Sequence, residues 1–164
     1  MALNDRPSVA LPPPGAEKPR KTFVKVKEGT TLSSLSRQYY GQVNITLIDK
    51  IMMSNPEITN PHLIRTDQTI EIPHITEDSF IIESPDRTFK VHVGTFVRAE
   101  FAKQYRDEAD LKGREIEIVP RKVSAQETWY ATLAGKFDSR EECLRTIRIL
   151  RSKGLLPALI ITPQ

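Results

Sequence analysis

Apolar residues recur with helix and strand periods in two separate regions of this chain, 22–73 and 89–162. Each region is long enough to fold as a small domain of its own. The pattern therefore predicts two domains, at 22–74 and 88–162, with a linker at 75–87.

The segments outside these regions lack a core-forming pattern. Residues 1–20 contain five of the twelve prolines, so we expect a disordered Pro-rich tether. Residues 80–82, between clusters of turn-forming residues, form either a short strand or a docking segment. The longest apolar run, 155–161, is too short to cross a bilayer, so we expect no membrane insertion by this segment. No apolar stretch of signal-peptide length opens the chain, and we expect a fragment of a longer protein.

The first region predicts the order strand, helix, helix, strand. Residues 22–27 alternate as a strand does, and Gly29 supplies the turn that follows. Two helices are expected at 31–40 and 44–54, each bounded by residues that cap or stop a helix. A second strand closes the unit at 69–72.

Several landmarks of this region fall in a familiar order. Gly29-Thr30-Thr31-Leu32 opens the first helix, Tyr40-Gly41 ends it, Asn55-Pro56 ends the second, and the segment 67–73 closes the unit. The region resembles the LysM module, a small βααβ fold that binds N-acetylglucosamine-containing glycans. It departs from the family pattern at Thr30, where aspartate is usual, and at Thr66-Asp67, where proline-glycine is usual.

The resemblance implies a shallow sugar-binding groove between two loops. Its expected walls are Gly29, Thr30, Thr31 and Leu32 on one side and Asn55, Pro56, Glu57 and Ile58 on the other. Each of these residues also has a structural explanation, because turns, caps and a core call for the same residue types.

The second region predicts the order βαββαβ. Strands are expected at 89–96, 115–119, 129–134 and 158–161, with helices at 98–111 and 139–150. The second helix begins with an S-x-x-E capping box formed by Ser139 and Glu142. This is the split arrangement of ferredoxin-like folds, and the fold class of the chain is therefore α+β.

Two strands of this region end in the same way, with glycine, one residue and phenylalanine. These are Gly94-Thr95-Phe96 and Gly135-Lys136-Phe137, and Trp129-Tyr130 begins the second strand. The region resembles the SPOR domain, which binds peptidoglycan glycan strands that lack stem peptides. SPOR domains bind glycan on the sheet face opposite the helices.

Strand alternation places four candidate ligand-binding residues on that face. They are Lys90, His92, Trp129 and Leu133. An indole there could stack on a sugar ring while polar groups bond its hydroxyls. Two alternatives stay open: Trp129 is a partly buried edge aromatic, or residues 80–82 cover the face.

No enzyme motif, cofactor signature or metal-ligand spacing occurs in the sequence, so we expect no catalytic or metal site and no cofactor. Cys143 lies in a helical apolar pattern and is expected to be a buried core thiol. The net charge of +3 is spread without a basic tract, and nucleic acid is an unlikely partner.

The two resemblances imply a non-catalytic binding module for bacterial peptidoglycan, in the periplasm or cell envelope, that anchors a parent protein to the wall. The alternative is a structural module in which the LysM-like fold mediates protein contacts, in an envelope complex or a phage baseplate.

Overall fold

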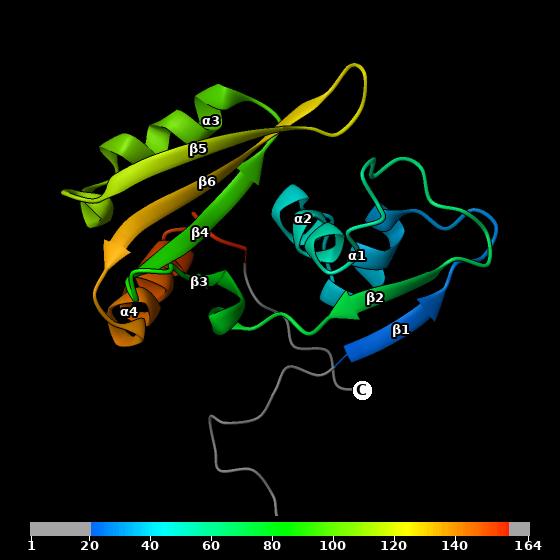
Figure 1. Ribbon diagram of the computed structural model, residues 1–164, viewed down its shortest axis with the longest axis horizontal. Coiled ribbons are helices and arrows are strands. Elements are labelled where there is room, and N and C mark those ends of the chain that lie inside the picture. The colour runs from blue at the N-terminus through cyan, green and yellow to red at the C-terminus, as the bar shows by residue number, and fades with distance from the viewer. Residues whose placement is uncertain (1–20, 158–164) are drawn as a thin grey trace, which may run out of the picture.

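The computed structural model describes residues 21–157 and folds them into a two-stranded and a four-stranded sheet with helices (Figure 1). The tether expected at 1–20 and the strand expected at 158–161 lie outside the described residues. No helix within 21–157 is both long and apolar enough to cross a membrane.

The first half has the predicted order of elements. It consists of β1 (Lys21–Lys25), α1 (Leu32–Tyr40), α2 (Ile45–Met53) and β2 (Thr69–Pro73). β1 and β2 pair antiparallel, with Phe23 opposite Glu71. The two helices pack on each other, and α2 also contacts β2. Leucine and isoleucine side chains from both helices and from β2 fill the space between them: Leu32, Leu35, Leu47, Ile51, Ile70 and Ile72.

The ends of α1 and α2 follow from local chemistry. Thr31 accepts a hydrogen bond from the backbone N–H of Ser34 at 3.0 Å, and Ser34 accepts one from the Thr31 N–H, which completes a capping box. Gly41 ends α1 in the left-handed conformation, with φ of 78°. Asn44 caps α2 through its side-chain oxygen. The caps and stops predicted for these helices are confirmed.

Thr66-Asp67 stands where LysM modules usually have a proline-glycine turn, and the turn before β2 still forms. Asp67 takes the left-handed conformation, with φ of 71°, at the position where the LysM pattern has glycine. A short polar side chain tolerates this conformation better than most. Its backbone N–H still bonds the Val26 carbonyl at 2.7 Å, which fixes the turn before β2.

The second half is a four-stranded antiparallel sheet with strand order β3-β4-β6-β5. Its strands are β3 (Ile81–Glu83), β4 (Phe89–Phe96), β5 (Glu115–Lys122) and β6 (Thr128–Phe137), and its helices are α3 (Ala99–Lys103) and α4 (Arg140–Ser152). Short 3-10 turns lie at Glu77–Phe80, Gln104–Asp107 and Ala109–Leu111. The helices contact the sheet, and Cys143 is buried as expected.

The connecting segment belongs to this sheet. β3 pairs with the first half of β4, with Ile81 opposite Val91, and Phe80 is buried just before it. Ile81 and Ile82 therefore belong to a strand, and the buried Phe80 is the last residue of the 3-10 turn that precedes it.

The helix predicted at 98–111 is wrong beyond Lys103. Two 3-10 turns replace its second half, and Glu108 between them is extended, with ψ of 126°. Consecutive acids at Asp107 and Glu108 would lie at the negative end of a helix dipole, which disfavours continuation. The Glu108 carboxylate instead accepts a bond from the backbone N–H of Asp110 at 3.2 Å.

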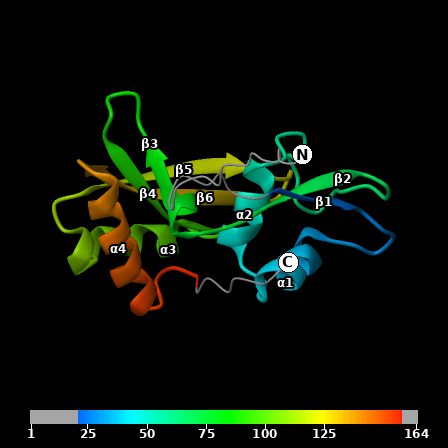
Figure 2. The same cartoon turned by 90° about the horizontal axis from the view of Figure 1, so that it is seen from below.

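The two halves pack against each other. Figures 1 and 2 show α2 between the two-stranded sheet and the four-stranded sheet, and α2 contacts β4. Neighbouring residues of β4 show which face α2 meets. Phe96 contacts Tyr105 beyond α3, with ring centroids 5.5 Å apart, whereas Thr95 on the opposite face bonds Thr46 and Asp49 of α2. The first half therefore covers part of the helix-free face of the second.

Candidate functional site

The two loops predicted to hold a sugar are only partly open to solvent. Gly29, Thr31, Pro56 and Glu57 are exposed and Thr30 is half-buried. The other predicted wall residues, Leu32, Asn55 and Ile58, are buried. Loop backbone and short side chains are thus the accessible part, which suits the shallow hydrogen-bonding groove expected for an aminosugar.

Asn55 connects two elements of the first half. Its amide nitrogen donates to the Ile51 carbonyl at 2.7 Å and to the Glu71 carbonyl at 2.8 Å. Its amide oxygen accepts from the Glu71 N–H at 2.9 Å. The first bond ties Asn55 to the end of α2, and the two bonds with Glu71 tie it to β2. Asn55 therefore supports the loop from inside the domain, and only its exposed neighbours can contact a ligand.

The four residues predicted on the helix-free sheet face share that face. Leu133 pairs with His92 in β4 and with Glu117 in β5. Lys90 bonds Glu117 across the sheet at 2.9 Å, and Trp129 lies opposite Arg121. The predicted grouping is thus present in the sheet.

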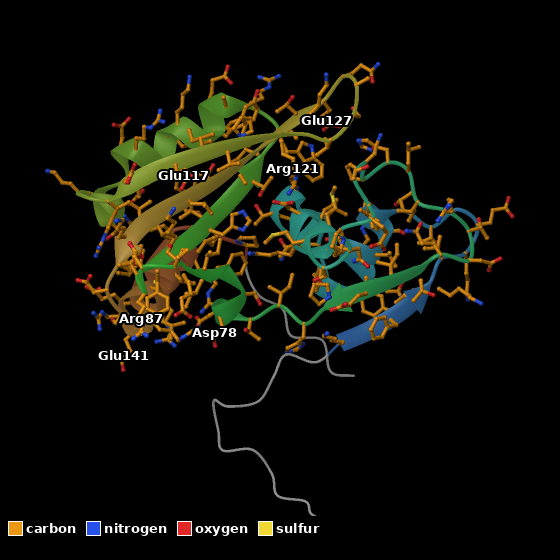
Figure 3. All side chains as sticks on the ribbon, viewed as in Figure 1. Asp78, Arg87, Glu117, Arg121, Glu127 and Glu141 are labelled. Atoms are coloured by element: carbon orange, nitrogen blue, oxygen red, sulfur yellow. The ribbon has the colours of Figure 1, made fainter. Side chains whose placement is uncertain are left out.

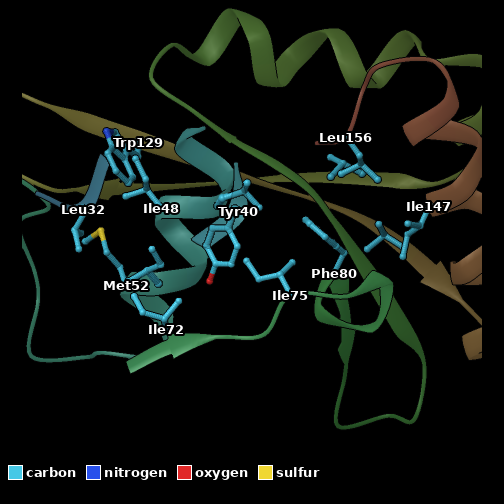
Figure 4. Close-up of a cluster of buried hydrophobic side chains, with 14 of the residues drawn as sticks. Leu32, Tyr40, Ile48, Met52, Ile72, Ile75, Phe80, Trp129, Ile147 and Leu156 are labelled. Carbon is cyan, nitrogen blue, oxygen red and sulfur yellow. The ribbon is translucent and has the colours of Figure 1, made fainter. Parts of the chain in front are cut away.

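Their exposure to solvent differs from the prediction. His92 and Trp129 are each only 2% exposed, while Lys90 and Leu133 are half-buried. Trp129 belongs to the same hydrophobic cluster as Ile48 and Met52 of α2 (Figure 4). The Phe80 ring lies 6.4 Å from the His92 ring. α2 therefore covers Trp129 on this face, and Phe80 lies against His92.

A buried carboxylate stands at the centre of the contact between the halves. Asp49 of α2 is 1% exposed and accepts a hydrogen bond from Thr95 Oγ1 at 2.5 Å. It also forms an ion pair with Arg121 of β5 (Figure 3). Thr46, one turn earlier on α2, accepts from the backbone N–H of Thr95 at 3.0 Å. Charge-assisted bonds of this kind fix the orientation of the two halves.

His92 is neutral in this environment. Its Nε2 lies 2.9 Å from Thr95 Oγ1, and because that hydroxyl donates to Asp49, Nε2 carries the proton. Burial holds the pKa of His92 well below its usual value of 6.5, and the positive charges of Lys50 and Arg121 lower it further.

Lys50 is a second buried charge on α2. Its ammonium donates to the Ser79 carbonyl at 2.7 Å and lies 4.8 Å from the centre of the Phe80 ring. Burial lowers the pKa of Lys50 to about 8, an effect that the nearby Asp49 carboxylate opposes. The side of α2 that faces the second half is therefore rich in polar groups.

A further link joins the halves at the loop between β5 and β6. Glu127 accepts from Trp129 Nε1 at 2.9 Å and pairs with His62 Nε2 at 2.8 Å (Figure 3). These bonds, to Trp129 first and His62 second, hold the pKa of Glu127 below its usual value.

An open pocket of about 330 Å³ lies at the seam between the halves. Its lining combines residues of α2 and the following loop with the end of β5: Met52, Met53, Pro56, Ile58, Thr59, Arg121 and Lys122. Two predicted wall residues of the first half, Pro56 and Ile58, thus lie beside two cations of the second.

No group of three histidine, cysteine or carboxylate side chains that could hold a metal ion occurs among residues 21–157. The sites within this part of the chain are built from loops, a sheet face and a polar contact between domains.

Family comparisons identify both modules. The LysM domain model matches residues 24–73, and the SPOR domain model matches residues 85–162. The chain contains a LysM domain followed by a SPOR domain, as the sequence predicted, and both are peptidoglycan-binding modules. Searches of curated proteins and of solved structures found no match to the chain.

Sequence reasoning missed the residues at the centre of the domain contact. Asp49, Thr95 and Arg121 belong to no motif, and each lies in a helix or strand with an ordinary pattern. The one available signal was an acid and a lysine, Asp49-Lys50, within an otherwise apolar helix.

Proposed function

We propose that this chain binds glycan strands of bacterial peptidoglycan without cutting them and anchors a parent protein to the cell wall. The observation that carries the proposal is the presence of two peptidoglycan-binding domains in one chain. The exposed LysM loops support it, since Gly29, Thr31 and Glu57 are accessible at the predicted groove. Cell envelope or periplasm is the matching location.

Retention on purified sacculi tests this proposal. We expect the full chain to sediment with sacculi and to be displaced by N-acetylglucosamine oligomers. The double variant Thr31→Asn, Glu57→Ala should weaken retention severalfold, because asparagine preserves the helix cap while the groove changes shape. Glu100→Ala, at an exposed site on α3, is the matched control and should bind as the wild type does.

A second candidate function is protein assembly through the LysM domain. Four large apolar side chains of this domain are exposed: Phe23, Val43, Met53 and Leu63. Exposed apolar groups of this size favour protein contacts when they lie together. Failure to bind sacculi, together with defined oligomers in analytical ultracentrifugation, would replace wall binding by this function.

A further inference from the structure

The pocket at the seam joins one wall of the LysM groove to two cations of the SPOR domain. Pro56 and Ile58 line this pocket, and both belong to the loop that is predicted to form one side of the sugar groove. Arg121 and Lys122, at the end of β5, line the same pocket. A group attached to a sugar in the groove can therefore reach the SPOR domain while α2 stays in place.

The two cations are available to a ligand in different ways. Arg121 pairs with Asp49 but is 42% exposed, and a guanidinium has five N–H donors, so donors remain beyond that pair (Figure 3). Lys122 is exposed and forms no ion pair with any residue in 21–157. The buried Asp49 carboxylate balances Arg121, and Lys122 therefore supplies a net positive charge that is suited to a carboxylate.

The rest of the pocket lining is mainly apolar. Met53 is 52% exposed and offers apolar surface to a ligand, while Met52 and Ile58 form the buried part of the lining. Methionine adapts its shape to small aliphatic groups. A sugar ring carries hydroxyls on several sides and needs polar partners for them, which this lining supplies poorly. The lining fits a short chain with small aliphatic side chains and a carboxylate.

We propose that this pocket binds the first residues of a peptidoglycan stem peptide, attached to a sugar that the LysM groove holds. The alanine joined to the lactyl group supplies a methyl group, which contacts Met53. The acidic residue that follows supplies a free carboxylate, which bonds Lys122 and Arg121. This proposal rests on the proposed function and adds to it a preference for glycan that carries peptide.

This role for the SPOR domain does not use its helix-free sheet face. Trp129 on that face is 2% exposed and packs in one cluster with Ile48 and Met52 of α2. The end of β5, in contrast, presents Arg121 and Lys122 to an open pocket of about 330 Å³, a volume at the lower end of the range for small-ligand sites. The ligand therefore binds at the edge of the sheet, with both domains in the arrangement described.

The test compares the binding of three tetrasaccharides by isothermal titration calorimetry. All three alternate N-acetylglucosamine with N-acetylmuramic acid. The first carries alanyl-D-glutamic acid on each lactyl group, and the second carries the same dipeptide with both glutamate carboxyls converted to amides. The third has no peptide and keeps free lactyl carboxylates.

Two variants remove the same charge from different places. Lys122→Gln takes one positive charge from the pocket and keeps a long side chain there. Lys112→Gln does so near the other end of β5, at a lysine that is also exposed, and serves as the control. Arg121 is left unchanged because it also bonds Asp49. Thermal melts check that each variant is folded.

We expect the wild type to bind the acidic dipeptide sugar about threefold to tenfold more tightly than the amidated one, because a carboxylate gains charge-assisted bonds at a partly exposed site. The peptide-free sugar should bind as weakly as the amidated one or more weakly. Lys122→Gln should lose most of the difference between the acidic and amidated sugars, and Lys112→Gln should keep it.

Methyl NMR locates the peptide on the protein. With ¹³C-labelled methionine methyl groups, the acidic dipeptide sugar should shift the signals of Met52 and Met53, and the peptide-free sugar should shift them much less. Met53→Leu assigns the Met53 signal. Equal shifts with the two sugars would mean that the pocket takes the glycan itself, and this would overturn the proposal.

Two failures can be told apart. If the wild type is retained on sacculi but binds the acidic and amidated sugars equally, or if Lys122→Gln keeps the whole difference, the proposal is wrong and the proposed function stands. If the wild type binds neither sacculi nor any of the three sugars, the proposed function is wrong and the proposal fails with it.

Discussion

His92 has a structural role that its position in a strand pattern does not reveal. Alternation placed it on the helix-free face, and the structure keeps it there. Neutral imidazole bonded to the Thr95 hydroxyl completes a chain that ends at the Asp49 carboxylate. The residue thus helps to hold the two domains together, and its protonation would add a third positive charge beside Lys50 and Arg121.

The depressed pKa of His92 makes stability depend on pH. The folded protein binds this proton more weakly than the unfolded chain does, so stability is fully present above pH 6.5 and falls as the pH drops below it. We expect the slope from this group to rise toward about 1.4 kcal/mol per pH unit as the pH falls below 6.5. Urea unfolding at a series of pH values measures it.

His92→Gln is the matched control for that slope, because glutamine can still donate to Thr95 but does not titrate. The difference between the two slopes is the contribution of His92. Identical slopes would show that the imidazole is not desolvated in the folded protein.

At the scale of single residues, caps and turns could be predicted and buried partners could not. Thr31 and Gly41 act on atoms within a few residues, so their roles follow from local sequence. The partners of Asp49 lie 46 and 72 residues further along the chain, at Thr95 and Arg121. Nothing in a local pattern specifies such pairs.

At the scale of elements, α2 is the most informative, since it belongs to two contacts at once. One side packs in the LysM core through Leu47 and Ile51, and the other meets the SPOR sheet through Thr46 and Asp49. Sequence periodicity predicted the helix and its apolar side. It could not predict that the polar side is also buried, because an isolated LysM domain would leave that side in water.

Asn55 should be important to the stability of the LysM domain. Asn55→Ala removes three hydrogen bonds and leaves the carbonyls of Ile51 and Glu71 without this partner. We expect a loss of about 2–4 kcal/mol in unfolding free energy. Chemical denaturation followed by circular dichroism gives the value.

Asn60→Ala is the comparison for that variant, since Asn60 makes one side-chain bond, to the backbone of His62. It should cost less than about 1 kcal/mol. Equal losses in the two variants would mean that the bonds between α2 and β2 contribute little.

At the scale of the whole molecule, the fold of each domain could be predicted but their association could not. Both domains were predicted from short landmarks, and the family comparisons confirm them in the same order. The contact between them arises from tertiary packing of Asp49 and Lys50 in α2 and of Trp129 in β6.

Trp129 is the only tryptophan in the chain, and its burial gives it a structural role. Trp129→Ala opens a large cavity in a cluster shared by both domains. We expect it to lower the unfolding free energy by about 3–5 kcal/mol, measured by guanidinium unfolding. A stability close to wild type would contradict the burial of the indole.

The outer edge of the four-stranded sheet has a consequence for solubility. β5 is an edge strand within the described sheet, and it carries Pro120 together with charges at Glu115, Glu117 and Arg121. Proline lacks a backbone donor and like charges repel when two such strands approach, so this edge resists pairing with another copy. Copies of this chain at high local concentration can therefore remain dispersed without forming β-aggregates.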